Sequence, residues 1–283
     1  MSDDGQLVSS GKAISHKCLN SLLLIISVFL FLSELEAQSP AIRVAAAADL
    51  SFAMADLSGQ FEKQTGIKVN VTSGSSGNFF SQIQNGAPFD LFFSADIEYP
   101  RKLAAAGFAE PETLQEYALG RIVIWAPADA KVDVAKQGWS ALLDASVQKI
   151  AIANPEHAPY GRAAVSGLQT AGIYEQVKTK LIYGENISQA AQFVQSGNAQ
   201  AGIIARSLAI SPGMKEGKIW EIPAETYPPI EQGAVVLKSA KNKNAARAFL
   251  EFVSSVAGRK ILEKHGFAIP EPSNRNVRTE DPR

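Results

Sequence analysis

The chain has 283 residues, of which 46% are hydrophobic and 19% charged, which excludes a disordered or collagen-like chain. Lys and Arg number 27 against 28 Asp and Glu, so the net charge of −1 gives no bulk electrostatic reason to expect nucleic-acid binding. The one cysteine, Cys18, cannot form an internal disulfide, and the three histidines show no zinc-ligand spacing. The length predicts roughly two domains.

The N-terminal segment has the pattern of a secretory signal peptide. A weakly basic stretch at 12–17 is followed by an apolar run at 22–32, which is shorter than the roughly 20 residues that span a bilayer. The small residue Ala37 offers a cleavage site, so residues 1–37 are predicted to be removed. An uncleaved membrane anchor is the alternative. The mature chain, without Cys18, is then exported, and in a bacterium we expect it in the periplasm.

The first half of the mature chain alternates short apolar runs with segments of helical periodicity. The expected elements are a strand at 42–46, a helix from Asp49 to Gly66, a strand at 67–71, a small-residue loop at 73–77, a helix carrying Phe79, Phe80 and Ile83 that stops at Gly86, a strand at 91–93 and a helix at 95–105.

The second half repeats this alternation. The expected strands lie at 121–125, 149–153, 181–183, 201–205 and 234–237, with a helical face on Ala164, Val165 and Leu168, a helix capped by Asn186, and two C-terminal helices before Gly266. Strands that alternate with helices predict an α/β fold, with parallel sheets covered on both faces.

Four helix starts follow predicted strands, at Asp49, Ser76, Tyr160 and Ile187. A helix N-terminus carries N–H groups without intrahelical partners and a partial positive charge, which suits an anion. Ligands in α/β proteins bind at the carboxyl ends of strands, so the four starts are expected to converge on one cleft. The cleft is predicted to be rich in neutral donors and poor in Lys and Arg.

Four stretches of the sequence, in the same order, resemble the periplasmic molybdate-binding proteins of ABC-type molybdate importers; they are 44–50, 73–77, 86–96 and 154–161. The resemblance runs from about Ile42 to Pro270. It implies a type 2 periplasmic-binding-protein fold, with two lobes of mixed, mostly parallel sheets joined by a two-strand hinge. The implied boundaries are 38–122 and 235–270 for the first lobe, 123–234 for the second, and 271–283 for a mobile tail, with hinge strands near 122–125 and 234–237.

The resemblance also implies the ligand contacts. They fall at Asp49, Ser76, Tyr160 and Ile187, with Tyr160 and Ile187 acting through backbone N–H groups, so that side-chain identity matters little there. Ser76 donates through its hydroxyl and its N–H group. A tyrosine donor that some members carry is missing at Ala205. The implied ligand is molybdate or tungstate, with molybdenum held as its oxyanion and no protein-ligated metal cation.

By the same resemblance, the implied protein is a monomer that is not an enzyme, needs no cofactor, binds no nucleic acid and delivers its ligand to an ABC permease.

Asp49 is an unexpected residue at an anion site, because two like unit charges 4 Å apart repel by roughly 4 kcal/mol at an effective dielectric of 20. We expect its side chain to turn back as an N-cap and leave only N–H groups for the ligand. A protonated carboxyl and a different ligand are the alternatives, and Ser51 is a candidate substitute donor.

Three other functions fit parts of the sequence. The ligand could be sulfate or phosphate instead of molybdate. Sulfate is smaller, and phosphate carries a proton that needs a hydrogen-bond acceptor in the site. A serine hydrolase would use Ser76, His157 and Asp49, but 74–77 lacks the spacing of a nucleophile elbow. An effector domain of a regulator would follow a DNA-binding segment, whereas here a signal-like segment precedes the fold.

Overall fold

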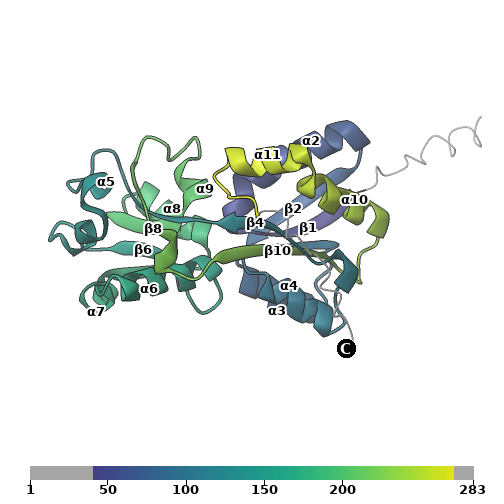
Figure 1. Cartoon of the computed structure of the whole chain (residues 1–283), viewed down its shortest axis with the longest axis horizontal. Helices are drawn as coiled ribbons and strands as arrows, with labels where there is room; N and C mark the ends of the chain where they lie inside the picture. Colours follow the sequence, from purple (N-terminus) through teal and green to yellow (C-terminus); the bar gives the residue numbers. More distant parts are fainter. Residues whose placement is uncertain (1–40, 271–283) are drawn as a thin grey trace, which may run out of the picture. The chain divides into compact units, whose positions relative to one another are not determined.

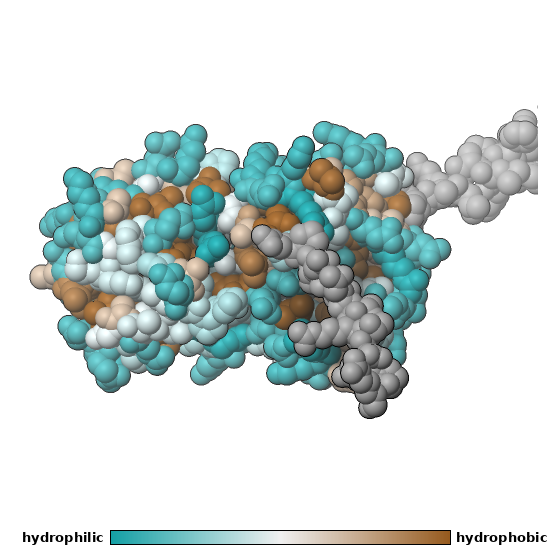
Figure 2. Space-filling model, viewed as in Figure 1, coloured by the Kyte–Doolittle hydropathy of each residue, from teal (hydrophilic) through white to brown (hydrophobic). Residues whose placement is uncertain are grey.

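The computed structural model describes residues 41–270, so the predicted signal peptide (1–37) and C-terminal tail (271–283) lie outside the described residues. Within that range, no helix has both the length and the apolar character needed to cross a membrane. Figure 2 shows hydrophilic residues over much of the viewed face, with hydrophobic residues in patches between them. Most large apolar side chains are buried around two sheets.

The first sheet has five strands in the order β2-β1-β3-β10-β4. Its three parallel strands are followed by β10, which runs antiparallel to both of its neighbours. The bounds are β1 Ala41–Ala47, β2 Lys68–Gly74, β3 Leu91–Ser94, β4 Gln115–Gly120 and β10 Ile230–Val236. We call this sheet with its helices the first half. β1 is an almost uninterrupted apolar run because helices cover both faces of the sheet.

The second sheet repeats this plan in the order β7-β6-β8-β5-β9. Its parallel strands β7, β6 and β8 are followed by β5, which is antiparallel to β8 and to β9. The bounds are β5 Ile122–Ala126, β6 Ile150–Ala153, β7 Leu181–Gly184, β8 Ala201–Ala205 and β9 Lys218–Glu221. We call this sheet with its helices the second half. The predicted α/β class with mixed, mostly parallel sheets is confirmed.

Helices cover both faces of each sheet. In the first half, α2, α10 and α11 lie on one face and α3 and α4 on the other (Figure 1). The helices of this half are α2 Ser51–Thr65, α3 Ser76–Gln84, α4 Glu98–Ala105, α10 Lys243–Ser254 and α11 Val256–Lys264. Those of the second half are α5 Val134–Gln137, α6 Pro159–Thr170, α7 Tyr174–Val177, α8 Ile187–Gln195 and α9 Arg206–Ala209.

The predicted elements are largely confirmed, but the short helices α5, α7 and α9 were not predicted, and some other elements also differ. The helix expected at 95–105 begins only at Glu98, because the Asp96 carboxylate accepts a hydrogen bond from the Glu98 N–H group (2.9 Å) in a preceding turn. Strands β4 and β9 were not predicted. β4 begins with polar residues, and β9 is a half-exposed edge strand, so neither has the apolar run of a buried strand.

The chain passes between the halves twice. It leaves the first sheet at the end of β4, enters the second at β5, and returns between β9 and β10. The segments predicted as the hinge, 122–125 and 234–237, instead lie in β5 and at the end of β10, whereas the chain crosses at residue 121 and at 222–229. Ile230 in β10 pairs with Gly120 in β4, so the two crossings start from neighbouring positions of the first sheet.

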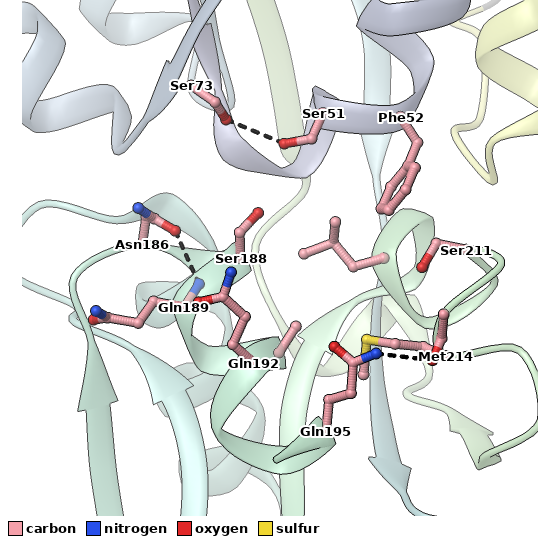
Figure 3. Close-up of a pocket in the computed structure, with 13 residues that line it drawn as sticks. Ser51, Phe52, Ser73, Asn186, Ser188, Gln189, Gln192, Gln195, Ser211 and Met214 are labelled. Carbon is pink, nitrogen blue, oxygen red and sulfur yellow. Dashed lines mark hydrogen bonds between the residues drawn. The ribbon is translucent and has the colours of Figure 1, made fainter.

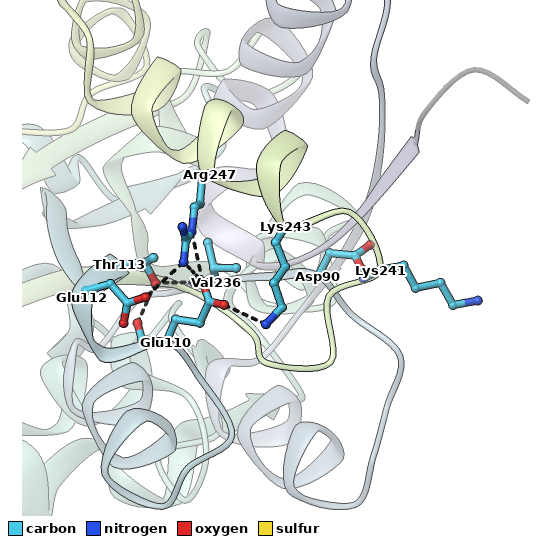
Figure 4. Close-up of polar contacts among 8 residues, drawn as sticks. All are labelled: Asp90, Glu110, Glu112, Thr113, Val236, Lys241, Lys243 and Arg247. Carbon is cyan, nitrogen blue, oxygen red and sulfur yellow. Dashed lines mark hydrogen bonds and ion pairs between the residues drawn. The ribbon is translucent and has the colours of Figure 1, made fainter.

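A buried carboxylate fixes helix α10 to the first sheet (Figure 4). Glu110 is 6% exposed, and its carboxylate pairs with Lys243 (2.9 Å) and Arg247 (2.7 Å) of α10. Its N–H group donates to the Val236 carbonyl at the end of β10 (2.9 Å). Although burial raises the pKa of Glu110, hydrogen bonds from Lys243 and Arg247 outweigh it and lower the pKa.

Candidate functional site

The four predicted helix starts meet around one small cavity of about 10 Å³. It is lined by 47–49 at the end of β1, by 74–76 at the end of β2, by Ala95 after β3, by 158–160 at the start of α6 and by 186–187 at the start of α8. These segments follow the carboxyl ends of parallel strands, where α/β folds place their ligands. The predicted convergence of Asp49, Ser76, Tyr160 and Ile187 is therefore found in the structure, with residues from both halves around one space.

Ser76 supplies two donors to the cavity. It is the first residue of α3, so its N–H group has no intrahelical partner. Its Oγ accepts a hydrogen bond from the Ala95 N–H group (2.9 Å), which leaves its hydroxyl proton free to donate. Ser75 holds the turn before it, since its Oγ caps the helix through the Asn78 N–H group (3.4 Å). Ser76 itself is 1% exposed.

The second half supplies two further backbone donors. Ile187 is the first residue of α8, which Asn186 caps by accepting from the Gln189 N–H group (3.0 Å) as predicted. Tyr160 is the second residue of α6, directly after Pro159 at the first helical position. The N–H groups of Ile187 and Tyr160 lie in the first helical turn, so neither has an intrahelical partner.

The side chain of Tyr160 also contributes, which the sequence did not predict. It is 2% exposed, and its hydroxyl donates to Asp49 Oδ2 (2.8 Å), from one half of the protein to the other. Gly120 leaves room for this ring, because a Cβ atom there would lie 2.4 Å from the Tyr160 hydroxyl oxygen. The expectation that side-chain identity matters little at Tyr160 is therefore wrong.

Asp49 is not an N-cap, so that prediction is also wrong. A 3-10 turn at Ala48–Leu50 precedes α2 and moves the helix start to Ser51, and Asp49 makes no capping hydrogen bond. Its carboxylate instead faces the protein interior and is 1% exposed. Oδ2 accepts from Tyr160 and from Gln232 Nε2 (2.5 Å), while Oδ1 has no partner among the described residues.

Sequence reasoning missed two residues that hold Asp49 in place. Gln232 of β10 is fully buried, and its Nε2 donates to the Tyr160 hydroxyl oxygen (2.9 Å) as well as to Asp49. Tyr117 of β4 donates to Gln232 Oε1 (2.6 Å), which fixes the orientation of the amide. Glu231 and Gln232 are adjacent polar residues in β10, so the local sequence does not mark Gln232 as the buried one, and nothing local links it to Asp49.

Burial controls the ionisation of this network. It raises the pKa of Asp49 from 3.8 to about 6, against the opposing effects of Gln232, Tyr160 and the nearby backbone N–H groups of Asp49 and Leu50. Burial, and next the charge on Asp49, raise the pKa values of Tyr117 and Tyr160 well above 10.0. The two phenols therefore stay protonated and act as hydrogen-bond donors at neutral pH.

The halves also meet beside the cavity through neutral groups. The Gly77 N–H group donates to the His157 carbonyl (3.0 Å), and Ser75 Oγ lies 2.9 Å from that carbonyl and 3.0 Å from His157 Nδ1. His157 thus contacts Ser75 and not Ser76, and Asp49 contacts neither. The hydrolase constellation of Ser76, His157 and Asp49 is not assembled.

A larger pocket of about 470 Å³ lies beside the cavity (Figure 3). Ser51, the candidate substitute donor, lines this pocket and not the small cavity. Its hydroxyl donates to the Ala48 carbonyl (2.7 Å) and lies 3.1 Å from Ser73 Oγ. Ser51 therefore stabilises the turn at the start of α2 and supplies no donor to the cavity.

The cavity matches the predicted chemistry of neutral donors. Among its lining residues, all of which fall within the described range, there is no Lys, Arg or His, and the one carboxylate is Asp49. Nor do residues 41–270 contain a group of three or more His, Cys, Asp or Glu side chains that could hold a metal ion. The arrangement suits an anion held by N–H and hydroxyl groups.

Comparison with known proteins agrees with this chemistry. Residues 42–268 match the family described as bacterial extracellular solute-binding proteins. A molybdate-binding protein of Azotobacter vinelandii is 39% identical over 82% of this chain and 92% of its own length. One of Rhodobacter capsulatus is 38% identical over 79% and 86%. The solved periplasmic molybdate-binding protein of Azotobacter vinelandii superposes with a TM-score of 0.77 and 36% identity, over 81% of this chain and all of that one.

These matches span both halves and nearly the whole described range, and they confirm the resemblance found in the sequence. They also confirm the prediction of a solute-binding protein rather than an enzyme. The chain therefore belongs to the bacterial extracellular solute-binding proteins and, within them, to the family of its molybdate-binding relatives.

Proposed function

We propose that the protein captures molybdate outside the cytoplasm, after export and removal of residues 1–37, and delivers it as a monomer to the permease of an ABC importer. Two relatives that align with most of this chain are molybdate-binding proteins, which supports molybdate over sulfate or phosphate. Tungstate has nearly the same size and charge, so we expect it to bind at the same donors.

The observation that carries this proposal is the convergence of three helix N-termini and the Ser76 hydroxyl on one cavity without a cation. Such donors recognise a fully ionised oxyanion through hydrogen bonds, and the helix ends add a favourable partial charge. Of the four predicted ligand contacts, Asp49, Ser76, Tyr160 and Ile187, only Asp49 has a carboxylate side chain.

Binding follows from the way the two halves share these donors. The oxyanion docks on the first half at Ser76 and at the backbone near Asp49. The crossings next to β4 and β10 then bend, and the second half brings the N–H groups of Tyr160 and Ile187 onto the remaining oxygens. Closure excludes water, and the permease recognises the closed form.

Calorimetric titration tests the proposal directly. Purified residues 38–283 are titrated with molybdate, tungstate, sulfate and phosphate, and the first two are expected to bind tightly. Ser76→Ala removes a hydroxyl donor to a charged ligand, so we expect affinity for molybdate to fall about 10- to 100-fold. Ser81→Ala, on the exposed side of the same helix, is the matched control and should bind as the parent does. No heat with any of the four anions would contradict the proposed function.

A second test concerns closure. A Cβ atom at Gly77 would lie 2.7 Å from the His157 carbonyl oxygen, across the contact between the halves. Gly77→Ala should therefore favour the open form and weaken molybdate binding at least tenfold, although alanine favours the helix itself. The control is Gly59→Ala in α2, where nothing lies within 4 Å of the added methyl group. Equal affinities of the two variants would show that the Gly77 contact plays no part in binding.

A further inference from the structure

Asp49 is a lining residue of the proposed anion site, and one oxygen of its buried carboxylate is unused. It lines the cavity, is 1% exposed, and its Oδ1 has no hydrogen-bond partner among residues 41–270. An unpartnered carboxylate oxygen at a buried position is costly, and it becomes more so when a doubly charged anion enters the same cavity.

The hydrogen-bond directions around Asp49 decide which oxygen can carry a proton. Tyr117 donates to Gln232 Oε1, so the Gln232 Nε2 group faces Asp49 and donates to it. Tyr160 donates to the same oxygen, Oδ2. Because Oδ2 already accepts two hydrogen bonds, Oδ1 is the atom that remains for a proton.

No cation offsets the carboxylate. The titratable groups that face it are two phenols, Tyr160 from α6 and Tyr117 from β4, and both stay protonated at neutral pH. Tyr160 in turn is affected by Tyr227, which is affected by the charge of Arg121. The contacts from β10 and α9 are uncharged: Gln232 donates to the side chain, and Ser207 Oγ donates to the Asp49 carbonyl (2.8 Å). No Lys, Arg or His side chain among residues 41–270 contacts Asp49.

We propose that Asp49 takes up one proton when the doubly charged oxyanion binds, so that the site captures anion and proton together. The proton comes from solvent and forms an O–H bond at Oδ1, and nothing is oxidised or reduced. The neutral carboxyl no longer repels the ligand, and Oδ1 becomes a hydroxyl group. This inference rests on the proposed function and adds a second determinant of specificity to it.

The direction of the pH effect follows. Burial outweighs the hydrogen bonds to Asp49 and raises its pKa to about 6, and a neighbouring anion raises it further. Between the pKa values of the free and the bound protein, each molybdate ion brings one proton with it. Affinity should therefore fall as pH rises through this window, approaching tenfold for each pH unit.

Calorimetry at pH 6.5, 7.5 and 8.5, a range in which molybdate stays a dianion, measures this linkage. Titrations in buffers of different ionisation enthalpy should give an uptake of up to one proton per molybdate, and the affinity should fall with pH. Asp49→Asn mimics the protonated carboxyl, because its oxygen can accept from Tyr160 and Gln232 while its amide N–H₂ takes the place of Oδ1. We expect this variant to bind without proton uptake, with an affinity independent of pH and above that of the parent at pH 8.5.

The exposed Asp129, changed to Asn, is the control and should keep the pH dependence of the parent. His157 is another titratable group where the halves meet, through its contact with Ser75. If Asp49→Asn kept the pH dependence, His157 or another group would be its origin and the inference would be overturned. The inference would also be overturned if the affinity of the parent protein for molybdate did not change from pH 6.5 to 8.5. The same holds if the parent bound phosphate more tightly than molybdate and Asp49→Asn lost this preference. Absence of all anion binding in both proteins would instead reject the proposed function.

Discussion

Gly161→Ala is expected to destabilise the protein by about 3 kcal/mol and to abolish tight oxyanion binding. Gly161 is the third residue of α6, and a Cβ atom there would lie 2.2 Å from the Ala153 carbonyl oxygen and 2.9 Å from the Asn154 carbonyl carbon. Both contacts are backbone atoms at the end of β6, so no side chain can rotate away. The start of α6 must move, and the Tyr160 N–H group moves with it.

Denaturant unfolding of this variant measures the loss of stability, and molybdate titration measures the loss of binding. Ser166→Ala, in the same helix and partly exposed, is the matched control, for which we expect a change within about 0.5 kcal/mol. An unfolding midpoint for Gly161→Ala equal to that of the control would show that α6 and β6 do not pack as closely as the structure places them.

The second large effect is the stability of Asp49→Asn, which should exceed that of the parent by about 3 kcal/mol at pH 7.5. Folding raises the pKa of Asp49 from 3.8 to about 6, so the folded chain holds this proton more tightly than the unfolded chain does. The stability that this proton contributes is complete below pH 3.8 and is lost as pH rises through 6. Asparagine cannot ionise, so the Asp49→Asn variant does not lose this stability as pH rises.

The pH dependence of the difference is the decisive measurement. Denaturant unfolding of the two proteins from pH 4 to 8 should show nearly equal stabilities at pH 4, a gap that opens between pH 4 and 6, and a constant gap above that. A gap of the same size at every pH would mean that the asparagine acts through packing and not through charge. The exposed Asp129→Asn variant should show no such gap.

The sequence was sufficient to predict the backbone part of the candidate site. Ser76, Tyr160 and Ile187 contribute N–H groups at the starts of helices, and helix starts after buried strands can be read from local patterns of capping and apolar residues. The fold class followed from the same alternation. These predictions depend on residues close together in the chain, which is why they could be made.

The side-chain part of the site could not be predicted in this way. Gln232 donates to Asp49 from 183 residues away, and no local pattern connects them. The direction of the Asp49 side chain was predicted wrongly, because the 3-10 turn at Ala48–Leu50 moved the helix start by two residues and left the carboxylate facing the interior. Contacts of this kind depend on how the halves pack.

The position of β10 has a consequence for the order of folding. The second sheet is built from one continuous stretch, 122–221, whereas the first needs β10, residues 230–236, to insert between β3 and β4. As the chain is synthesised from its N-terminus, the half that is made first can complete its sheet only after the other half is finished. Its last strand must also close a loop of more than a hundred residues, which makes that step the slow, high-contact-order part of folding.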